Sequence, residues 1–210
     1  AERCSEKGVT FRYDCAVAGI ETTGGDFATV GFENGERLAG EACVVALGSY
    51  STLLLRPLGI RIPVYPAKGY SITIPLTADA SAPSVSLTDD GAKLVYSRLG
   101  NRLRVAGTAE FTGYDTQINP ARIEPLVRRV KQVFPGLDFR SDAVEPWTGL
   151  RPATPSNVPL VGPTRVANLY VNTGHGTLGW TLAVGSGRLL ADRVAGRDPA
   201  IDPAPYGLSG

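Results

Sequence analysis

The chain has 210 residues, 43% of them hydrophobic and 20% charged, with a formal net charge of +1. This balance is typical of a globular protein with one sizeable core or two small ones, and the lack of a basic surplus argues against a nucleic-acid partner. The three cysteines form no CxxC pair and there is a single histidine, so we expect no metal site and thiols kept reduced in the cytoplasm. No apolar run is long enough to span a bilayer. Methionine is absent, and we expect the natural protein to extend upstream of Ala1.

The first 59 residues predict a strand-rich segment. Three short stretches rich in β-branched and aromatic residues predict strands, at 9–13, 16–23 and 27–35. Residues 42–47 form a continuous apolar run, which suits a strand covered on both faces, as in a parallel α/β sheet. A short helix follows and is ended by Pro57 and Gly59.

Residues 60–147 predict an antiparallel sheet with one helix. Several segments alternate between apolar and polar residues, and "LGNR" is a good hairpin turn between the last two strands. In the segment 119–136, apolar residues recur on one face of a helix that Pro135 and Gly136 end: Ile123, Leu126, Val127, Val130 and Phe134.

Residues 148–210 begin with a proline-punctuated extended segment and continue into a strand and a long helix. We expect the helix to begin near Thr177 and to end at Gly196. The pattern predicts three parts, 1–59, 60–147 and 148–210, in which a small antiparallel domain is inserted into an α/β one.

The stretch "NTGHGTLGWT" holds the only histidine, His175, between two glycines at the predicted start of this helix. Backbone N–H groups in a first helical turn lack intrahelical partners and carry partial positive charge. Flanking glycines let a ligand approach the backbone, so the turn suits an anion or an atom that becomes anionic during a reaction. A tight strand–helix turn with His175 satisfied in the core explains the pattern equally well.

Two longer stretches carry a family resemblance. The first combines "GLRPATPSNVPLVGPT" with "NTGHGTLGWT", and the second is "ACVVALGSYSTLLLRPLGIRIPVYPAKGYSITIPL". Together they resemble the FAD-dependent glycine oxidase/D-amino acid oxidase family, in particular its bacterial D-amino acid dehydrogenases of the small-subunit type. That family opens with a strand–GxGxxG–helix segment that grips the FAD pyrophosphate, and we expect no GxGxxG anywhere in this chain.

The resemblance implies a fold of mixed α+β and α/β class. An antiparallel-sheet substrate domain is inserted into the remaining part of a Rossmann-like FAD-binding domain whose N-terminal βαβ unit is absent. The missing N-terminal half is then an expected partner, and we expect an exposed apolar surface where it docks.

The resemblance also implies roles for single residues. Arg151 of "GLRP" binds the substrate carboxylate through its planar guanidinium, with Tyr96 and Thr177 as further substrate contacts. FAD is contacted by Val17, Gly48, His175, Gly176, Thr177, Leu178, Gly179, Trp180 and Thr181, and the stretch Lys68–Gly69 could approach the flavin. The structural alternatives are a surface ion pair for Arg151, a core or rim position for Tyr96, a core aromatic for Trp180 and a plain turn for Lys68–Gly69.

The implied reaction is FAD-dependent oxidation of a D-amino acid to a 2-oxo acid and ammonia, with electrons passing to a quinone or another acceptor. The implied location is the cytoplasm, or peripherally the cytoplasmic face of the inner membrane. Two alternatives stay open. One is a non-catalytic fragment or subunit that binds a small acid or a partner chain without FAD, and the other is an amine oxidase similar to glycine or sarcosine oxidase.

Overall fold

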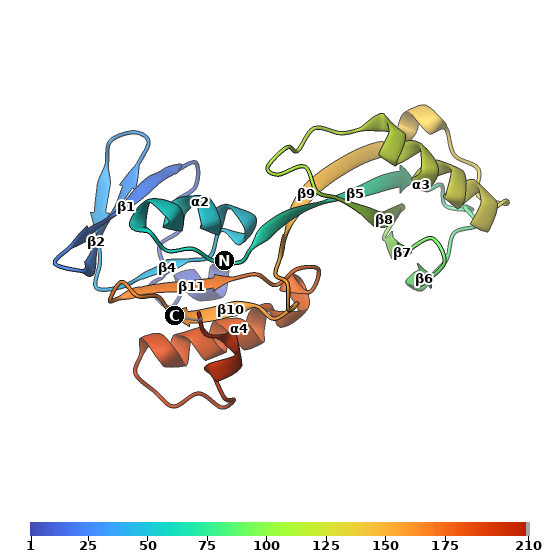
Figure 1. Cartoon of the computed structure of the whole chain (residues 1–210). Coiled ribbons are helices and arrows are strands. Elements are labelled where there is room, and N and C mark those ends of the chain that lie inside the picture. The colour runs from blue at the N-terminus through green and yellow to red at the C-terminus, as the bar shows by residue number, and fades with distance from the viewer. Residues whose placement is uncertain (209–210) are drawn as a thin grey trace. The chain divides into compact units, whose positions relative to one another are not determined.

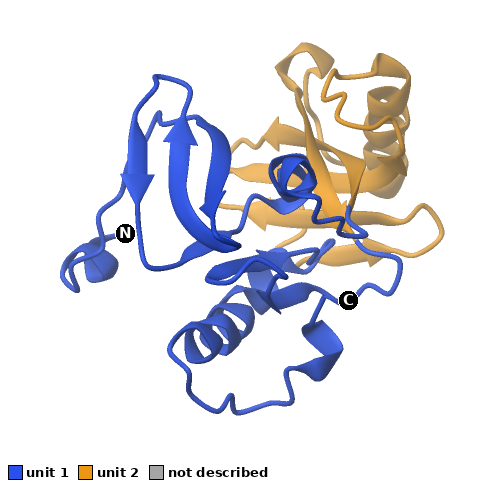
Figure 2. Ribbon diagram, turned by 60° about the vertical axis from the view of Figure 1, so that its left-hand side comes forward, with its two compact units in different colours: residues 1–64, 154–210 blue, residues 65–153 orange. Residues whose placement is uncertain are grey.

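The computed structural model describes residues 1–208 and divides into two compact units (Figure 2). Unit 1 contains residues 1–64 and 154–210, and unit 2 contains residues 65–153. Unit 2 is therefore an insertion in the sequence of unit 1, with bounds five and six residues later than those predicted. The second bound lies later because strand β9 (Glu145–Ala153) pairs along its whole length with β5 (Tyr65–Pro75) in unit 2 (Figure 1).

Unit 1 begins with a short helix, α1 (Glu2–Ser5), and an antiparallel meander. The meander consists of β1 (Val17–Thr23), β2 (Asp26–Phe32) and β3 (Arg37–Ala39). The strand predicted at 9–13 is wrong, since no regular element lies between α1 and β1. Phe11 and Tyr13 stack on each other there and stay exposed, because no neighbouring strand is available to pair with this segment.

The second sheet of unit 1 has the order β10-β11-β4. Its strands are β4 (Cys43–Val45), β10 (Leu160–Pro163) and β11 (Leu169–Thr173). The pair β4–β11 is parallel, as the apolar run at 42–47 predicted.

Helices flank the second sheet of unit 1. Helix α4 (Gly179–Val194) packs on β10 and β11 through a cluster built around Val161, Leu189 and Leu190. Alternate residues of β11, Leu169 and Val171, belong instead to the larger core that includes helix α2 (Ser51–Leu55) and the meander. The sheet therefore buries different side chains on each face. The other short helices are 3-10 turns at Gly48–Tyr50, Arg56–Leu58 and Ala204–Tyr206.

Unit 2 is a five-stranded antiparallel sheet of order β6-β7-β8-β5-β9. Besides β5 and β9, its strands are β6 (Leu87–Asp89), β7 (Leu94–Leu99) and β8 (Arg102–Glu110), and a 3-10 turn lies at Ser141–Ala143. The predicted hairpin between β7 and β8 is confirmed.

Helix α3 (Pro120–Val133) covers one face of the unit 2 sheet. Asn119 caps it by accepting a hydrogen bond from the Ala121 N–H (3.1 Å). The predicted stripe is confirmed, because Leu126 and Val130 are fully buried in the core and the other three members pack around it. The opposite face of the sheet is free of this helix.

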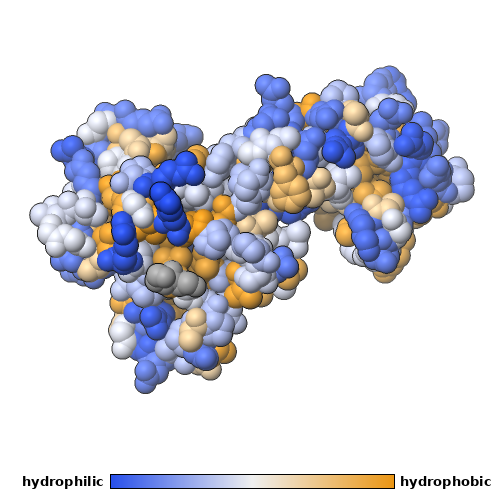
Figure 3. All heavy atoms as spheres, viewed as in Figure 1, coloured by the Kyte–Doolittle hydropathy of each residue, from blue (hydrophilic) through white to orange (hydrophobic). Residues whose placement is uncertain are grey.

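Apolar side chains also reach the surface of unit 1 among hydrophilic ones (Figure 3). On α4, Trp180 is 96% and Val184 is 86% exposed, four residues apart and so on one side of the helix. No described residue covers this strip. Docking of the expected N-terminal half at an apolar surface of this kind stays a prediction.

Candidate functional site

The loop at 174–178 of unit 1 follows the parallel strand β11 and precedes α4. Thr173 donates a hydrogen bond from Oγ1 to the carbonyl oxygen of Gly48 (2.8 Å), which joins the carboxyl ends of β11 and β4. Gly48, Gly174 and Gly176 all have left-handed φ angles of +55°, +81° and +54°. The structure thus brings the predicted Gly48 and the predicted glycine-rich turn together at the strand ends, where ligands bind in open α/β sheets.

His175 lies partly buried in this loop, and its carbonyl oxygen accepts a hydrogen bond from the Leu178 N–H (3.0 Å). Its Nε2 atom is buried and has no hydrogen-bond partner among the described residues. Burial lowers the pKa of His175, so the ring is neutral near pH 7. His175 is therefore not a core histidine whose polar atoms are all hydrogen-bonded. Its Nε2 atom can still form a hydrogen bond with a ligand.

Helix α4 begins at Gly179, two residues later than predicted. No side chain caps it, so its first-turn N–H groups are open to a ligand. A Cβ on Gly176 would meet no atom within 4 Å, so the approach to this backbone is open.

Four predicted cofactor contacts on this turn, Thr177, Leu178, Trp180 and Thr181, are exposed. The alternative of a core position for Trp180 is wrong at 96% exposure, while its flavin contact stays a prediction.

The expectation that this chain contains no GxGxxG is wrong. Gly174, Gly176 and Gly179 have the GxGxxG spacing, directly after a strand and before a helix. A βαβ unit has a second strand after its helix, and no strand follows α4 within the described residues. The spacing supports close approach of a polar ligand to the backbone.

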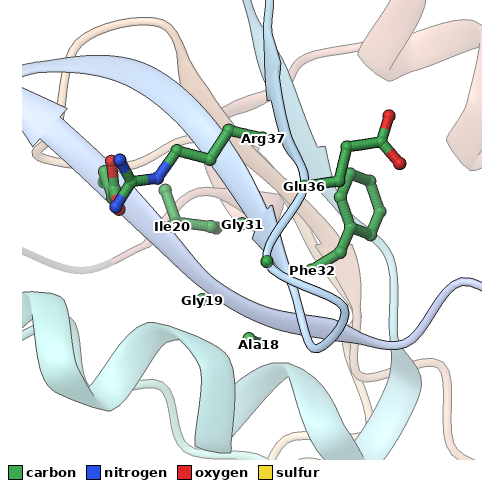
Figure 4. Close-up of a pocket in the computed structure, with 9 residues that line it drawn as sticks. Ala18, Gly19, Ile20, Gly31, Phe32, Glu36 and Arg37 are labelled. Atoms are coloured by element: carbon green, nitrogen blue, oxygen red, sulfur yellow. The ribbon is translucent and has the colours of Figure 1, made fainter.

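Val17, the predicted adenine contact, opens β1 at 36% exposure. Its neighbours Ala18 and Gly19 line a hollow of about 310 Å³ on the meander, where Gly19 and Gly31 present no side chains (Figure 4). Glu36 and Arg37 lie at its rim and point to opposite sides. A flat ring could enter this hollow next to Val17. The contact between Val17 and adenine itself stays a prediction.

Arg151 lies in β9 of unit 2, opposite Ala67 of β5. Its side chain crosses β5 over Gly69, where a Cβ would lie 2.2 Å from Nη1 and 2.3 Å from Cζ. Nη1 donates a hydrogen bond to the carbonyl oxygen of Thr108 in β8 (3.3 Å). Among the described residues no carboxylate lies within 4 Å of this guanidinium, and its burial lowers the pKa of Arg151. The alternative of a surface ion pair is therefore not observed.

Thr108 is the extra residue of a β-bulge, since Gly69 pairs with Ala109 and Tyr70 pairs with Gly107. Its φ of +55° is unusual for a β-branched residue, and its buried Oγ1 has no partner among residues 1–208. Bulges of this kind redirect a backbone group, and here the redirected carbonyl meets Arg151.

Tyr96 lies on the other face of the same sheet. It pairs with Val105, which pairs with Ile72, and all three belong to the core under α3. Tyr96 is 1% exposed, and burial is the main cause that raises its pKa. The structure does not bring Tyr96 to Arg151, and we leave Tyr96 out of the proposed site.

Lys68 is 1% exposed in the middle of β5, so the alternative of a plain turn at Lys68–Gly69 is wrong. Its Nζ contacts Glu110 Oε2 (3.1 Å), Asp115 Oδ2 (3.0 Å) and the Gln117 carbonyl oxygen (3.0 Å). Burial alone would lower the pKa of Lys68, but the hydrogen bonds outweigh it and raise that pKa. This ammonium fixes the loop that follows β8.

Residues 1–193 match the family described as FAD dependent oxidoreductase. This chain belongs to that family. Curated relatives include a D-amino acid dehydrogenase of Dechloromonas aromatica (strain RCB), 55% identical over 203 residues that cover 95% of this chain and 48% of that protein. Another, of Methylobacterium radiotolerans, is 52% identical over 202 residues that cover 96% and 48%. The chain spans about half the length of the curated relatives it matches.

Solved structures agree on the fold. An iminodiacetate oxidase from Chelativorans sp. BNC1 matches with a TM-score of 0.86 and 23% identity, over 98% of this chain and 55% of that one. A glycine oxidase from Geobacillus kaustophilus matches with a TM-score of 0.83 and 24% identity, over 98% and 54%. The α+β fold of this chain is therefore a portion of the FAD oxidoreductase fold, as the sequence predicted.

The residues of unit 1 fit a flavin nucleotide. The uncapped start of α4, the unpartnered Nε2 of His175 and the open glycine at 176 offer donors and space for a flat polar ring. No helix among the described residues is long and apolar enough to cross a membrane.

Proposed function

We propose that the protein carrying this chain oxidises D-amino acids to 2-oxo acids and ammonia with FAD. The observation that carries the proposal is the guanidinium of Arg151, partly buried over Gly69 without a carboxylate partner. A buried cation of this kind is costly unless an anion joins it, and a planar fork matches both oxygens of a carboxylate. The names of the relatives at about 50% identity support an amino acid as that anion.

Unit 2 supplies the anchor for the substrate. Arg151 fixes the carboxylate and so holds the amino acid in one orientation, while the Thr108 carbonyl and Gly69 fix the guanidinium itself. Orientation of this kind accounts for a large part of many enzymatic rate enhancements. Thr177 stays a predicted further substrate contact.

Unit 1 supplies the residues that would hold the flavin: Val17, Gly48 and the stretch from His175 to Thr181. Bound FAD would supply a hydride acceptor for the Cα–H of the substrate, and the imine product would hydrolyse in water to the 2-oxo acid and ammonia. The first-turn N–H groups of α4 stabilise negative charge on a bound polar ring. Neutral His175 can donate or accept a hydrogen bond there without adding charge.

The proposal includes an electron acceptor, a quinone or another oxidant, and a location in the cytoplasm or at the cytoplasmic face of the inner membrane. The names of the relatives support a dehydrogenase. The chain covers about half of these relatives, and we propose the portion it does not cover, expected to be N-terminal, as its partner.

Steady-state kinetics test the anchor. In the FAD-loaded protein, Arg151→Ala removes both the charge and the fork, and we expect kcat/KM for D-alanine to fall by about two to four powers of ten, or about 3–5 kcal/mol. A simple amine without a carboxylate, oxidised slowly, should be affected little. Near-normal kinetics of the variant with D-alanine would contradict the proposal that Arg151 binds the substrate carboxylate.

The alternatives predict different outcomes. Oxidation of glycine or sarcosine in preference to D-alanine, with oxygen as acceptor, would indicate an amine oxidase. A colourless preparation that no added FAD turns yellow would indicate a binding module without flavin.

A further inference from the structure

Small residues lie side by side on β5 and β9 in the face of the unit 2 sheet that carries Arg151. On β5 the side chains of Ala67 and Gly69 share this face, and on β9 their partners are Arg151 and Gly149. Gly69 and Gly149 are direct cross-strand partners. Two adjacent glycines leave a flat floor on which larger side chains can lie.

Two side chains lie on this floor. The guanidinium of Arg151 occupies the space that a Cβ on Gly69 would need. The indole of Trp147 occupies the corresponding space over Gly149, where a Cβ would lie 2.1 Å from Cη2 and 2.7 Å from Cζ2. Since opposite Cβ positions in an antiparallel pair are about 5 Å apart, the guanidinium and the indole cover neighbouring positions.

The indole is not part of the core. Trp147 is 57% exposed and outside the cluster under α3. It forms no hydrogen bond or ring contact with any residue that the structure describes. One side of the ring therefore rests on glycine, and the rest is an open apolar surface beside an unpaired cation.

We propose that Trp147 determines substrate specificity and that the preferred substrates are amino acids with large apolar or aromatic side chains. The inference rests on the proposed function of Arg151 as carboxylate anchor. A carboxylate held by Arg151 places the rest of the amino acid within reach of the indole, on which an aromatic ring can stack or an alkyl chain can pack. A methyl side chain covers little of this surface, and one extra methylene in an apolar site already changes selectivity by about tenfold or more.

A second aromatic surface on the same face serves as the control. Tyr65 and Phe111 pack together with ring centroids 5.7 Å apart, at 47% and 69% exposure. Tyr65 is the first residue of β5, four positions before Gly69, and pairs with Ala153, whereas the guanidinium of Arg151 extends over Gly69 and so toward Trp147. Tyr65 is equally aromatic but lies away from the carboxylate anchor.

The experiment compares D-phenylalanine with D-alanine in the FAD-loaded protein and measures dissociation constants by titration calorimetry beside kcat and KM. We expect a selectivity of at least about tenfold for D-phenylalanine, carried mainly by KM and by the dissociation constant. Trp147→Ala should reduce this ratio by about tenfold, and Trp147→Phe should retain most of it. Tyr65→Leu should leave the ratio unchanged.

The outcomes separate this inference from the proposed function. Equal losses for both substrates in Trp147→Ala, or a fall in the ratio with Tyr65→Leu, would overturn the role of Trp147. If Arg151→Gln weakens binding of both substrates while Trp147→Ala changes no ratio, only the specificity inference fails. If Arg151→Gln binds both as tightly as the unchanged protein does, the carboxylate anchor and the proposed function fail.

Discussion

Replacing Gly69 by alanine adds one carbon at the point where the guanidinium of Arg151 crosses β5. The new Cβ would lie 2.2 Å from Nη1 and 2.3 Å from Cζ and Nη2, whereas nonbonded atoms need about 3.5 Å. The guanidinium therefore has to move by about 1 Å, and a displacement of this size in a positioning group can cost about 10²-fold in rate, or about 2.7 kcal/mol. The φ of Gly69 is not left-handed, so alanine fits the strand backbone.

The assay measures kcat/KM for D-alanine and the thermal midpoint of the same variant. We expect kcat/KM to fall by about 10²-fold with a small change in midpoint, because the atoms that must move are the far end of a flexible side chain. Gly136→Ala is the matched control, since its Cβ would lie at an ordinary 3.7 Å from Ser81.

A double-mutant cycle identifies the path of the effect. In an Arg151→Ala background, Gly69→Ala should have no further effect on kcat/KM. A loss of the same size in both backgrounds would refute the reasoning, because it would show that Gly69 acts without the guanidinium.

Three further predictions concern stability. The hydrogen bond from Tyr70 and then the contact with Lys68 lower the pKa of Glu110 in the folded protein. Ionised Glu110 therefore stabilises the fold above its unfolded pKa of about 4.3, and this contribution is lost as the pH falls through the lower folded pKa. Glu110→Gln should therefore flatten the fall of the thermal midpoint below about pH 4, and parallel curves would contradict this. Burial lowers the pKa of His175, so the unfolded chain binds more protons just below about pH 6.5 and stability declines as the pH drops there. Melts of His175→Gln should lack this decline, and an unchanged slope would mean that another group titrates. Leu126 is 1% exposed in the core, and Leu126→Ala should lower the free energy of unfolding, measured with denaturant, by about 2–5 kcal/mol. Val133 is 38% exposed on the same helix, and Val133→Ala should lower it by about 1 kcal/mol or less. Equal losses would contradict the position of the core.

The local patterns of the sequence predicted much of the fold. The stripe on α3 and the hairpin between β7 and β8 are decided by neighbours within a few residues, so periodicity and turn chemistry were sufficient to find them. The predicted strand at 9–13 failed for the opposite reason. Residues of high strand propensity stay irregular when no partner strand is beside them.

The candidate site was only partly predictable. The motif containing Arg151 and the glycine-rich turn at 174–179 stand out in the sequence, although the GxGxxG spacing of that turn was overlooked. The family resemblance alone assigned Tyr96 to the substrate. The sequence pattern could not correct this, because β7 has apolar residues at both odd and even positions and so does not show which face it buries.

The sequence by itself determined the family, the helix under the unit 2 sheet and the residue types that could bind a carboxylate and a flavin. Only the tertiary structure decided that Arg151 crosses β5 over Gly69 to reach Thr108, 43 positions away, and that Trp147 lies beside it while Tyr96 faces the core. The physical reason is strand register. A one-residue shift in pairing moves every side chain of a strand to the other face, and the register is set by partner strands far away in the chain and by a bulge that no local pattern reveals.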